Sequence, residues 1–123
     1  MEEIKVSVKL REIDLPRFDI EQFIGRKEKI ASADTHRSKF GYYLKVSSTV
    51  IDVFQRGKET KELRAIRIFP LYEDDKGNIG WGKKTLLAEY LLLKKVSSPQ
   101  DLVGRDIIIQ STVKDGKEFL SFI

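Results

Sequence analysis

The chain has 123 residues, 41% of them hydrophobic, which is enough to bury one core and too few for two ordinary domains. Lys and Arg number 23 against 19 Asp and Glu, and the resulting net charge of +4 favours polyanionic partners. The lack of cysteine excludes disulfides and thiolate metal sites, and no apolar run reaches the roughly 20 residues that a membrane-spanning helix needs. No signal-peptide pattern opens the chain, and a composition rich in Lys and Glu is typical of heat-adapted organisms. We therefore expect a soluble, cytoplasmic protein from a thermophile.

The first expected element is a half-buried strand over residues 4–10. Polar side chains alternate there with an apolar set that comprises Ile4, Val6, Val8 and Leu10. We expect a single domain over residues 1–123, in which residues 1–12 form this extra strand and residues 23–123 form a barrel. Because the extra strand would have a free edge, it offers a route to a homodimer by pairing with a second copy.

A short helical turn and three strands are expected next, over residues 19–24, 27–37, 42–51 and 62–72. In the second of these strands, Tyr42 alternates with Leu44 toward the core, whereas Tyr43 and Lys45 belong to the opposite face. Pro70 cannot donate to a sheet ladder, so it indicates that the third strand lies at an edge or contains a bulge.

One helix is expected over residues 84–95, which contain no Gly or Pro and carry apolar residues at helical spacing. Its buried stripe is predicted to comprise Leu86, Leu87, Tyr90 and Leu91, with Lys94 at the end of the stripe. Two further strands are expected over residues 106–113 and 118–123, joined by a turn at Asp115 and Gly116.

The order of three strands, one helix and two strands resembles the oligonucleotide/oligosaccharide-binding (OB) fold. That fold is a mainly β, five-stranded Greek-key barrel with its helix between strands 3 and 4. Residues 23–27 and 101–106 strengthen the resemblance, because each stretch places an apolar pair, a Gly and a basic residue before a strand. Both phrases look like strand openings in small archaeal and viral OB-type proteins, in which the Gly permits a tight bend.

The resemblance implies a ligand groove across the second and third strands, flanked by loops at residues 35–40 and 114–117. A single strand of DNA or RNA would stack its bases on aromatic rings there, while cations neutralise its phosphates. The binding residues expected on this basis are Arg37, Lys39, Phe40, Tyr43, Lys45, Arg67, Phe69, Lys114 and Lys117. His36 would also touch the backbone of the nucleic acid.

No catalytic, metal or cofactor site is expected, because His36 lacks a second ligand and Asp74 and Asp75 belong to a turn. Nucleotide-binding and hydrolase motifs are also absent from the sequence. Trp81 has two interpretations, stacking on a base or closing the helix end against the barrel. The leading hypothesis is a non-enzymatic, single-stranded nucleic-acid-binding protein. The alternative is a protein-interaction module of the same fold, such as an adaptor, a complex subunit or a viral or plasmid accessory protein.

Overall fold

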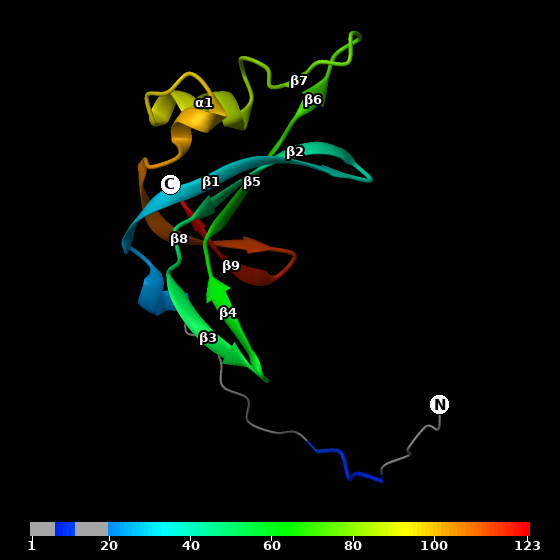
Figure 1. Cartoon of the computed structure of the whole chain (residues 1–123), viewed down its shortest axis with the longest axis vertical. Coiled ribbons are helices and arrows are strands. Elements are labelled where there is room, and N and C mark those ends of the chain that lie inside the picture. The colour runs from blue at the N-terminus through cyan, green and yellow to red at the C-terminus, as the bar shows by residue number, and fades with distance from the viewer. Residues whose placement is uncertain (1–6, 12–19) are drawn as a thin grey trace.

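The computed structural model describes residues 7–11 and 20–123, and this part of the chain is mainly β with one α-helix (Figure 1). Its elements, in chain order, are η1 (Ile20–Phe23), β1 (Lys27–Ser38), β2 (Gly41–Ser48), β3 (Asp52–Arg56), β4 (Glu59–Leu63), β5 (Ile66–Pro70), β6 (Tyr72–Glu73), β7 (Ile79–Gly80), α1 (Leu86–Leu93), η2 (Pro99–Leu102), β8 (Asp106–Lys114) and β9 (Lys117–Phe122). No helix in the described ranges is long and apolar enough to span a bilayer.

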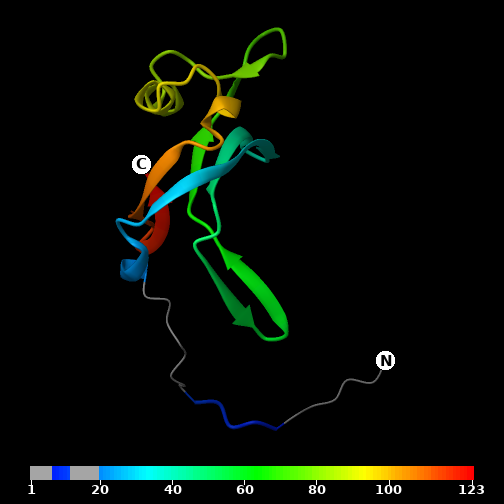
Figure 2. The same cartoon turned by 60° about the vertical axis from the view of Figure 1, so that its left-hand side comes forward.

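Five strands form one antiparallel sheet in the order β5-β2-β1-β8-β9. The β3–β4 and β6–β7 hairpins are separate two-stranded sheets, and they extend away from the large sheet at opposite ends (Figures 1 and 2). The edge strands β5 and β9 approach each other, so the large sheet is strongly curved. No backbone ladder joins these two edges within residues 20–123, and the sheet therefore stays open between them.

Strands β1 and β8 begin alike, each after a glycine in the left-handed region. Gly25 has a φ of +85° and Gly104 a φ of +87°, which residues with a Cβ rarely adopt. The Gly25 N–H donates to the Ile109 carbonyl, and the Gly104 N–H donates to the Ile30 carbonyl, both with N···O distances of 2.8 Å. Residues 23–27 and 101–106 therefore open strands, as expected. The two hydrogen bonds join the start of β1 to β8 and the start of β8 to β1.

The core joins α1 to both edges of the sheet. The Tyr90 ring lies 5.4 Å from the Phe69 ring of β5 and 6.3 Å from the Phe122 ring of β9, measured between centroids. Thr85 begins the helix as its N-cap, because its side chain accepts a hydrogen bond from the Ala88 N–H. The helix thus closes over the end of the curved sheet where β5 and β9 converge.

The buried stripe of α1 is narrower than the sequence predicts. Leu87, Tyr90 and Leu91 are buried, but Leu86 is 65% exposed. Leu86 is the first residue of the helix, and its side chain lies to one side of the face that Leu87 and Leu91 turn to the sheet. The prediction for Leu86 is therefore wrong.

The strand expected over residues 62–72 is divided into the end of β4, all of β5 and the first residue of β6. A bend separates β4 from β5 because two groups bind the buried Ser48. The Ser48 hydroxyl accepts a hydrogen bond from the Ala65 N–H at 2.8 Å, and Arg64 Nη1 donates to the Ser48 carbonyl at 2.9 Å. Pro70 ends β5, and β5 is an edge strand of the large sheet, which is one of the two alternatives that Pro70 indicates.

The strand expected over residues 4–10 is not formed in its described part. Residues 7–11 have no regular secondary structure, and Val8 and Leu10 are 64% and 91% exposed. A β-strand is stable only when a neighbouring strand accepts its backbone hydrogen bonds, and no strand in the described part of the chain pairs with these residues. Residues 4–6 of this predicted strand, and residues 1–6 and 12 of the N-terminal segment 1–12, lie outside the described residues.

Candidate nucleic-acid interface

Four of the expected binding residues lie together at the turn between β1 and β2. Phe40, at the tip of the turn, is 88% exposed, and the Lys39 Nζ lies 5.0 Å from the centre of its ring. Ser38 holds the turn in place, since its hydroxyl accepts a hydrogen bond from the Phe40 N–H and donates one to the Gly41 carbonyl. The remaining two of the four, Arg37 and Tyr43, stand on opposite faces of this hairpin.

Each face of the hairpin carries a ring contact between β1 and β2. The Arg37 guanidinium lies 5.4 Å from the centre of the Tyr42 ring, and Tyr42 is half-buried rather than fully in the core. On the other face, the Tyr43 ring stacks on His36, with a centroid distance of 5.5 Å and an interplanar angle of 18°. His36 thus presents its ring to the same side as Tyr43.

The outer face of β2 continues onto β5. Lys45 is half-buried, and its cross-strand partners are Asp34 in β1 and Ile68 in β5. Residues directly opposite each other in an antiparallel ladder point to the same face, so Ile68 lies beside Lys45. Ile68 is 61% exposed. The surface next to Lys45 is therefore apolar on the β5 side, whereas the exposed Asp34 lies on the β1 side.

Arg67 and Phe69 were expected on this outer face, and that prediction is wrong. Their partners in β2 are Val46 and Leu44, both buried, so the two side chains point to the inner side of the sheet. Phe69 is only 1% exposed. It cannot stack on a base without unfolding the core.

Arg67 lies between the two edge strands and α1. Its guanidinium carbon is 4.5 Å from the centre of the Tyr90 ring, and Nη1 donates to the Phe122 carbonyl at 3.3 Å. Burial raises the pKa of Tyr90 to about 12, while the positive charge of Arg67 opposes that rise. Arg67 therefore serves in the packing of β5 against α1 and β9.

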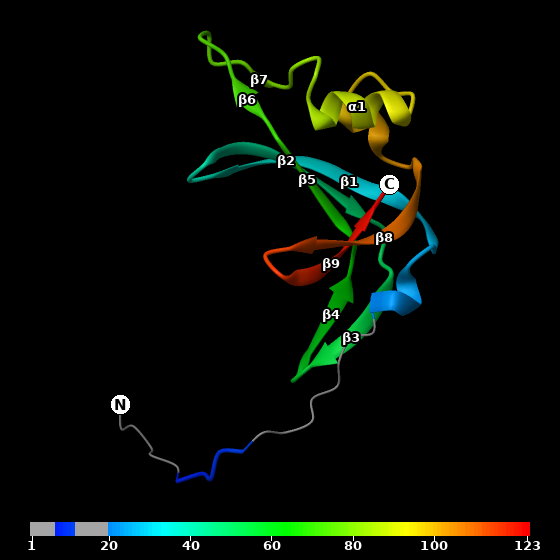
Figure 3. The same cartoon turned by 180° about the vertical axis from the view of Figure 1, so that it is seen from behind.

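Lys114 and Lys117 are a cross-strand pair at the turn between β8 and β9. Both residues of the turn have positive φ, +53° at Asp115 and +75° at Gly116, which is the geometry of the tight hairpin expected from this dipeptide. In Figure 1 the tip of this hairpin and the tip of the β1–β2 hairpin point to the same side of the molecule, and the view from behind in Figure 3 agrees.

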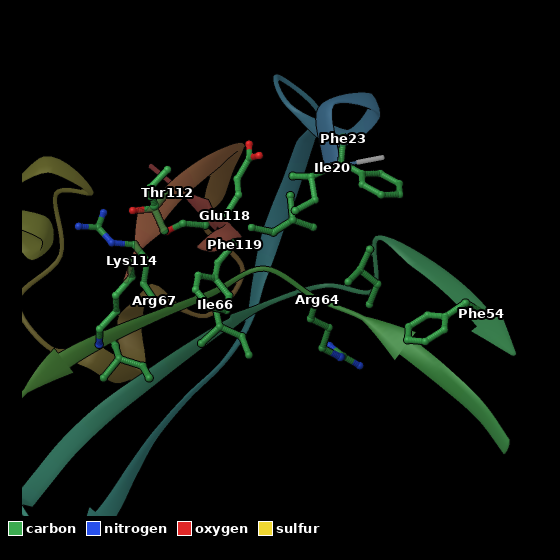
Figure 4. Close-up of a pocket in the computed structure, with 15 residues that line it drawn as sticks. Ile20, Phe23, Phe54, Arg64, Ile66, Arg67, Thr112, Lys114, Glu118 and Phe119 are labelled. Atoms are coloured by element: carbon green, nitrogen blue, oxygen red, sulfur yellow. The ribbon is translucent and has the colours of Figure 1, made fainter. Parts of the chain in front are cut away.

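A groove of about 850 Å³ runs between β5 and the β8–β9 hairpin (Figure 4). Its apolar lining includes the exposed side chains of Ile66, Ile68, Val113 and Phe119. Its charged lining consists of Arg64, Arg67, Lys114 and Glu118. Figure 4 shows Arg67 and Lys114 at one end of the groove and Phe54 at the other. The groove, which we call the β5–β9 groove, is thus apolar with an excess of positive charge.

The sequence analysis missed Phe119 and Arg64 as groove residues. Phe119 is 48% exposed and follows the Asp-Gly turn closely, so its place near a hairpin tip could have marked it. Arg64 could not have been found by strand alternation, because it lies in the bend between β4 and β5. Its guanidinium is already engaged with the Ser48 carbonyl and with the Glu62 carboxylate at 3.1 Å.

Trp81 lies apart from the groove residues. It is 38% exposed and lines a hollow with Tyr72 and Thr85, beside the β6–β7 hairpin and the start of α1. No cluster of three or more His, Cys, Asp or Glu side chains that could hold a metal occurs among the residues that the structure describes. Comparison with protein-family models, with curated proteins and with solved structures finds no match to this chain.

Proposed function

We propose that this chain is a non-catalytic, single-stranded nucleic-acid-binding protein with an OB-type topology. The bound strand would cross the outer face of β2 and enter the β5–β9 groove, between the β1–β2 and β8–β9 turns. This surface keeps Phe40, Tyr43, Lys45 and Lys114 from the sequence-based prediction, leaves out the buried Phe69, and adds Ile68 and Phe119. Arg67 also lines the groove, but its guanidinium already contacts Tyr90 and the Phe122 carbonyl.

The connectivity supports an OB-type topology. The five strands of the large sheet run β5-β2-β1-β8-β9, and α1 lies in the chain between β5 and β8, the third and fourth of these strands. Because β5 also lies close to β9, each strand has the neighbours that a partly open OB barrel requires. In that fold, the second and third strands and the two flanking turns contact the ligand.

The observation that carries the proposal is the occurrence of accessible rings and cations on β2, on the β1–β2 turn and in the β5–β9 groove. Phe40 and Phe119 are exposed, and Tyr43 is partly exposed, so all three can stack on bases. Lys45 and Lys114 lie beside apolar groove residues, where each can reach a phosphate without leaving its strand. Stacking and charge neutralisation together are what sequence-tolerant binding to a single strand needs.

Fluorescence polarisation with labelled oligo-dT, oligo-U and a duplex of equal length tests this proposal. If four cations contact phosphates, the affinity for a single strand falls by about 50-fold between about 50 and 200 mM salt, from a slope of about −0.7 per contact. Lys45→Ala removes one contact, so the plot of log affinity against log salt concentration becomes less steep by about 0.7. Phe119→Ala weakens binding by about 1–3 kcal/mol at every salt concentration, because one stacked base is lost.

A matched variant on the β6–β7 hairpin serves as the control for the lost charge. Lys76→Ala removes an exposed cation from the turn of that hairpin. This variant should bind oligonucleotides as the unaltered chain does. Absence of binding at low salt, or equal affinity for the duplex, contradicts the proposal.

A second candidate function is self-assembly by strand addition, and two observations favour it. The β5–β9 groove is bounded by two strands that do not pair with each other. Residues 7–11 leave Val8 and Leu10 exposed, although the sequence around them alternates as a strand does. An added strand could bury these side chains in the groove of a second copy and form a homodimer.

Deletion of residues 1–12 tests the second candidate, with the mass in solution measured by sedimentation over a range of protein concentrations. Strand addition predicts that the full chain forms a dimer and that the shortened chain is a monomer. An identical mass for both chains excludes this assembly. Nucleic-acid binding by both chains is measured in parallel, so that a negative result for dimer formation is distinguished from a negative result for the first proposal.

A further inference from the structure

A second depression lies between the end of α1 and η2, away from the β5–β9 groove. It has a volume of about 610 Å³, and its lining includes Leu92, Val96 and Val103 together with Lys95 and Arg105. Leu92 is 81% exposed and Val103 is 50% exposed. We call this depression the α1–η2 hollow; none of its lining residues is shared with the β5–β9 groove.

The helix ends at the hollow with an unusual residue choice. The Val96 N–H donates to the Leu91 carbonyl and the Lys95 N–H donates to the Leu92 carbonyl, which is the double hydrogen bond of a Schellman motif. The residue at the left-handed position of this motif is Lys95, with a φ of +58°, where Gly is the common choice. A side chain kept in a strained backbone position is a reason to look for a role of that side chain.

The charges and the apolar side chains of the hollow together define what fits it. Lys95 and Arg105 are exposed cations, while the Asp101 carboxylate accepts a hydrogen bond from the Ser98 hydroxyl at 3.0 Å. An occupant must therefore offer negative charge, and it must also cover Leu92 and Val103. The lining contains no aromatic ring, so bases would have nothing to stack on.

We propose that the α1–η2 hollow binds an acidic segment of a partner protein, with an apolar side chain of that segment placed between Leu92 and Val103. Carboxylates of the segment pair with Lys95 and Arg105. The hollow would then recruit a protein while the β5–β9 groove, with which it shares no lining residue, remains available for another ligand. The exposed Leu92 and Val103 next to two cations suit a short acidic and apolar peptide.

The test is a titration of the ¹⁵N-labelled full chain, followed by NMR, with a short synthetic peptide composed of Asp, Glu, Leu and Phe. We expect saturable shifts in the amides of Lys95, Val103 and Arg105. Lys95→Gly should weaken binding by about fivefold, the loss of one exposed ion pair. The same variant should raise the melting temperature by about 4 °C, because Gly adopts the left-handed conformation without strain.

The opposite signs of these two effects separate a binding role from a structural one. Leu92→Ser should also weaken binding without loss of stability, and Lys76→Gln should change neither property. Equal peptide affinity in all variants overturns the proposal. The proposal is also overturned if the peptide does not shift the amide signals of the residues that line the hollow. Shifts produced there by oligo-dT, or by raising the protein concentration alone, would assign the hollow to nucleic acid or to a second copy and equally overturn it.

Discussion

Replacement of Arg67 should mainly reduce the stability of the protein. The guanidinium carbon lies 4.5 Å from the Tyr90 ring centre and 4.9 Å from the Phe69 ring centre, and Nη1 donates to the Phe122 carbonyl at 3.3 Å. A cation–π contact contributes about 0.5–2 kcal/mol, and a hydrogen bond from a charged donor about 1.5–3 kcal/mol. Because Arg67 is only partly buried and its hydrogen bond is long, we expect Arg67→Ala to cost about 2 kcal/mol.

Thermal and urea unfolding, followed by circular dichroism, measure this loss. For a domain of this size, about 2 kcal/mol corresponds to a decrease of about 8 °C in melting temperature. Lys45→Ala is the matched control, since Lys45 lies on the adjacent strand but on the opposite face of the sheet. If the free energy of unfolding of Arg67→Ala lies within about 0.5 kcal/mol of that of the unaltered chain, the inward position of Arg67 is refuted.

Two further substitutions test the packing around the same strands. Ser48→Ala leaves the buried Ala65 N–H without an acceptor and should destabilise the protein by about 1–3 kcal/mol, whereas Thr60→Ala on the exposed β4 should have little effect in the same urea titration. The Tyr90 hydroxyl is buried without a hydrogen-bond partner among the described residues, so Tyr90→Phe should stabilise the protein by about 1 kcal/mol in that assay. Because burial raises the pKa of Tyr90 from 10.0 to about 12, the neutral form stabilises the fold below pH 10, and this contribution is lost as the pH rises toward 12. Tyr90→Phe should remove this loss of stability at alkaline pH. A steeper decrease of stability with pH in the variant would contradict the burial of the Tyr90 phenol.

Local chemistry in the sequence determined the strand openings, the turns and the helix. Gly25 and Gly104 precede strands because their backbone needs a positive φ, and Asp115 and Gly116 form a hairpin turn for the same reason. The helix was predictable because residues 86–93 carry apolar residues at helical spacing behind the Thr85 N-cap. Such features depend on neighbours within a few residues, and a sequence displays those neighbours directly.

Only the tertiary structure decided which face of β5 is buried. Ile66 and Ile68 on one face and Arg67 and Phe69 on the other are both partly apolar, so alternation alone does not choose between them. The choice depends on Tyr90, which is distant in sequence and packs on Phe69 from α1. The β5–β9 groove depends likewise on the curvature that brings two sheet edges together. The sequence by itself determined the elements and their order, whereas contacts between distant segments decided which of their side chains a ligand can reach.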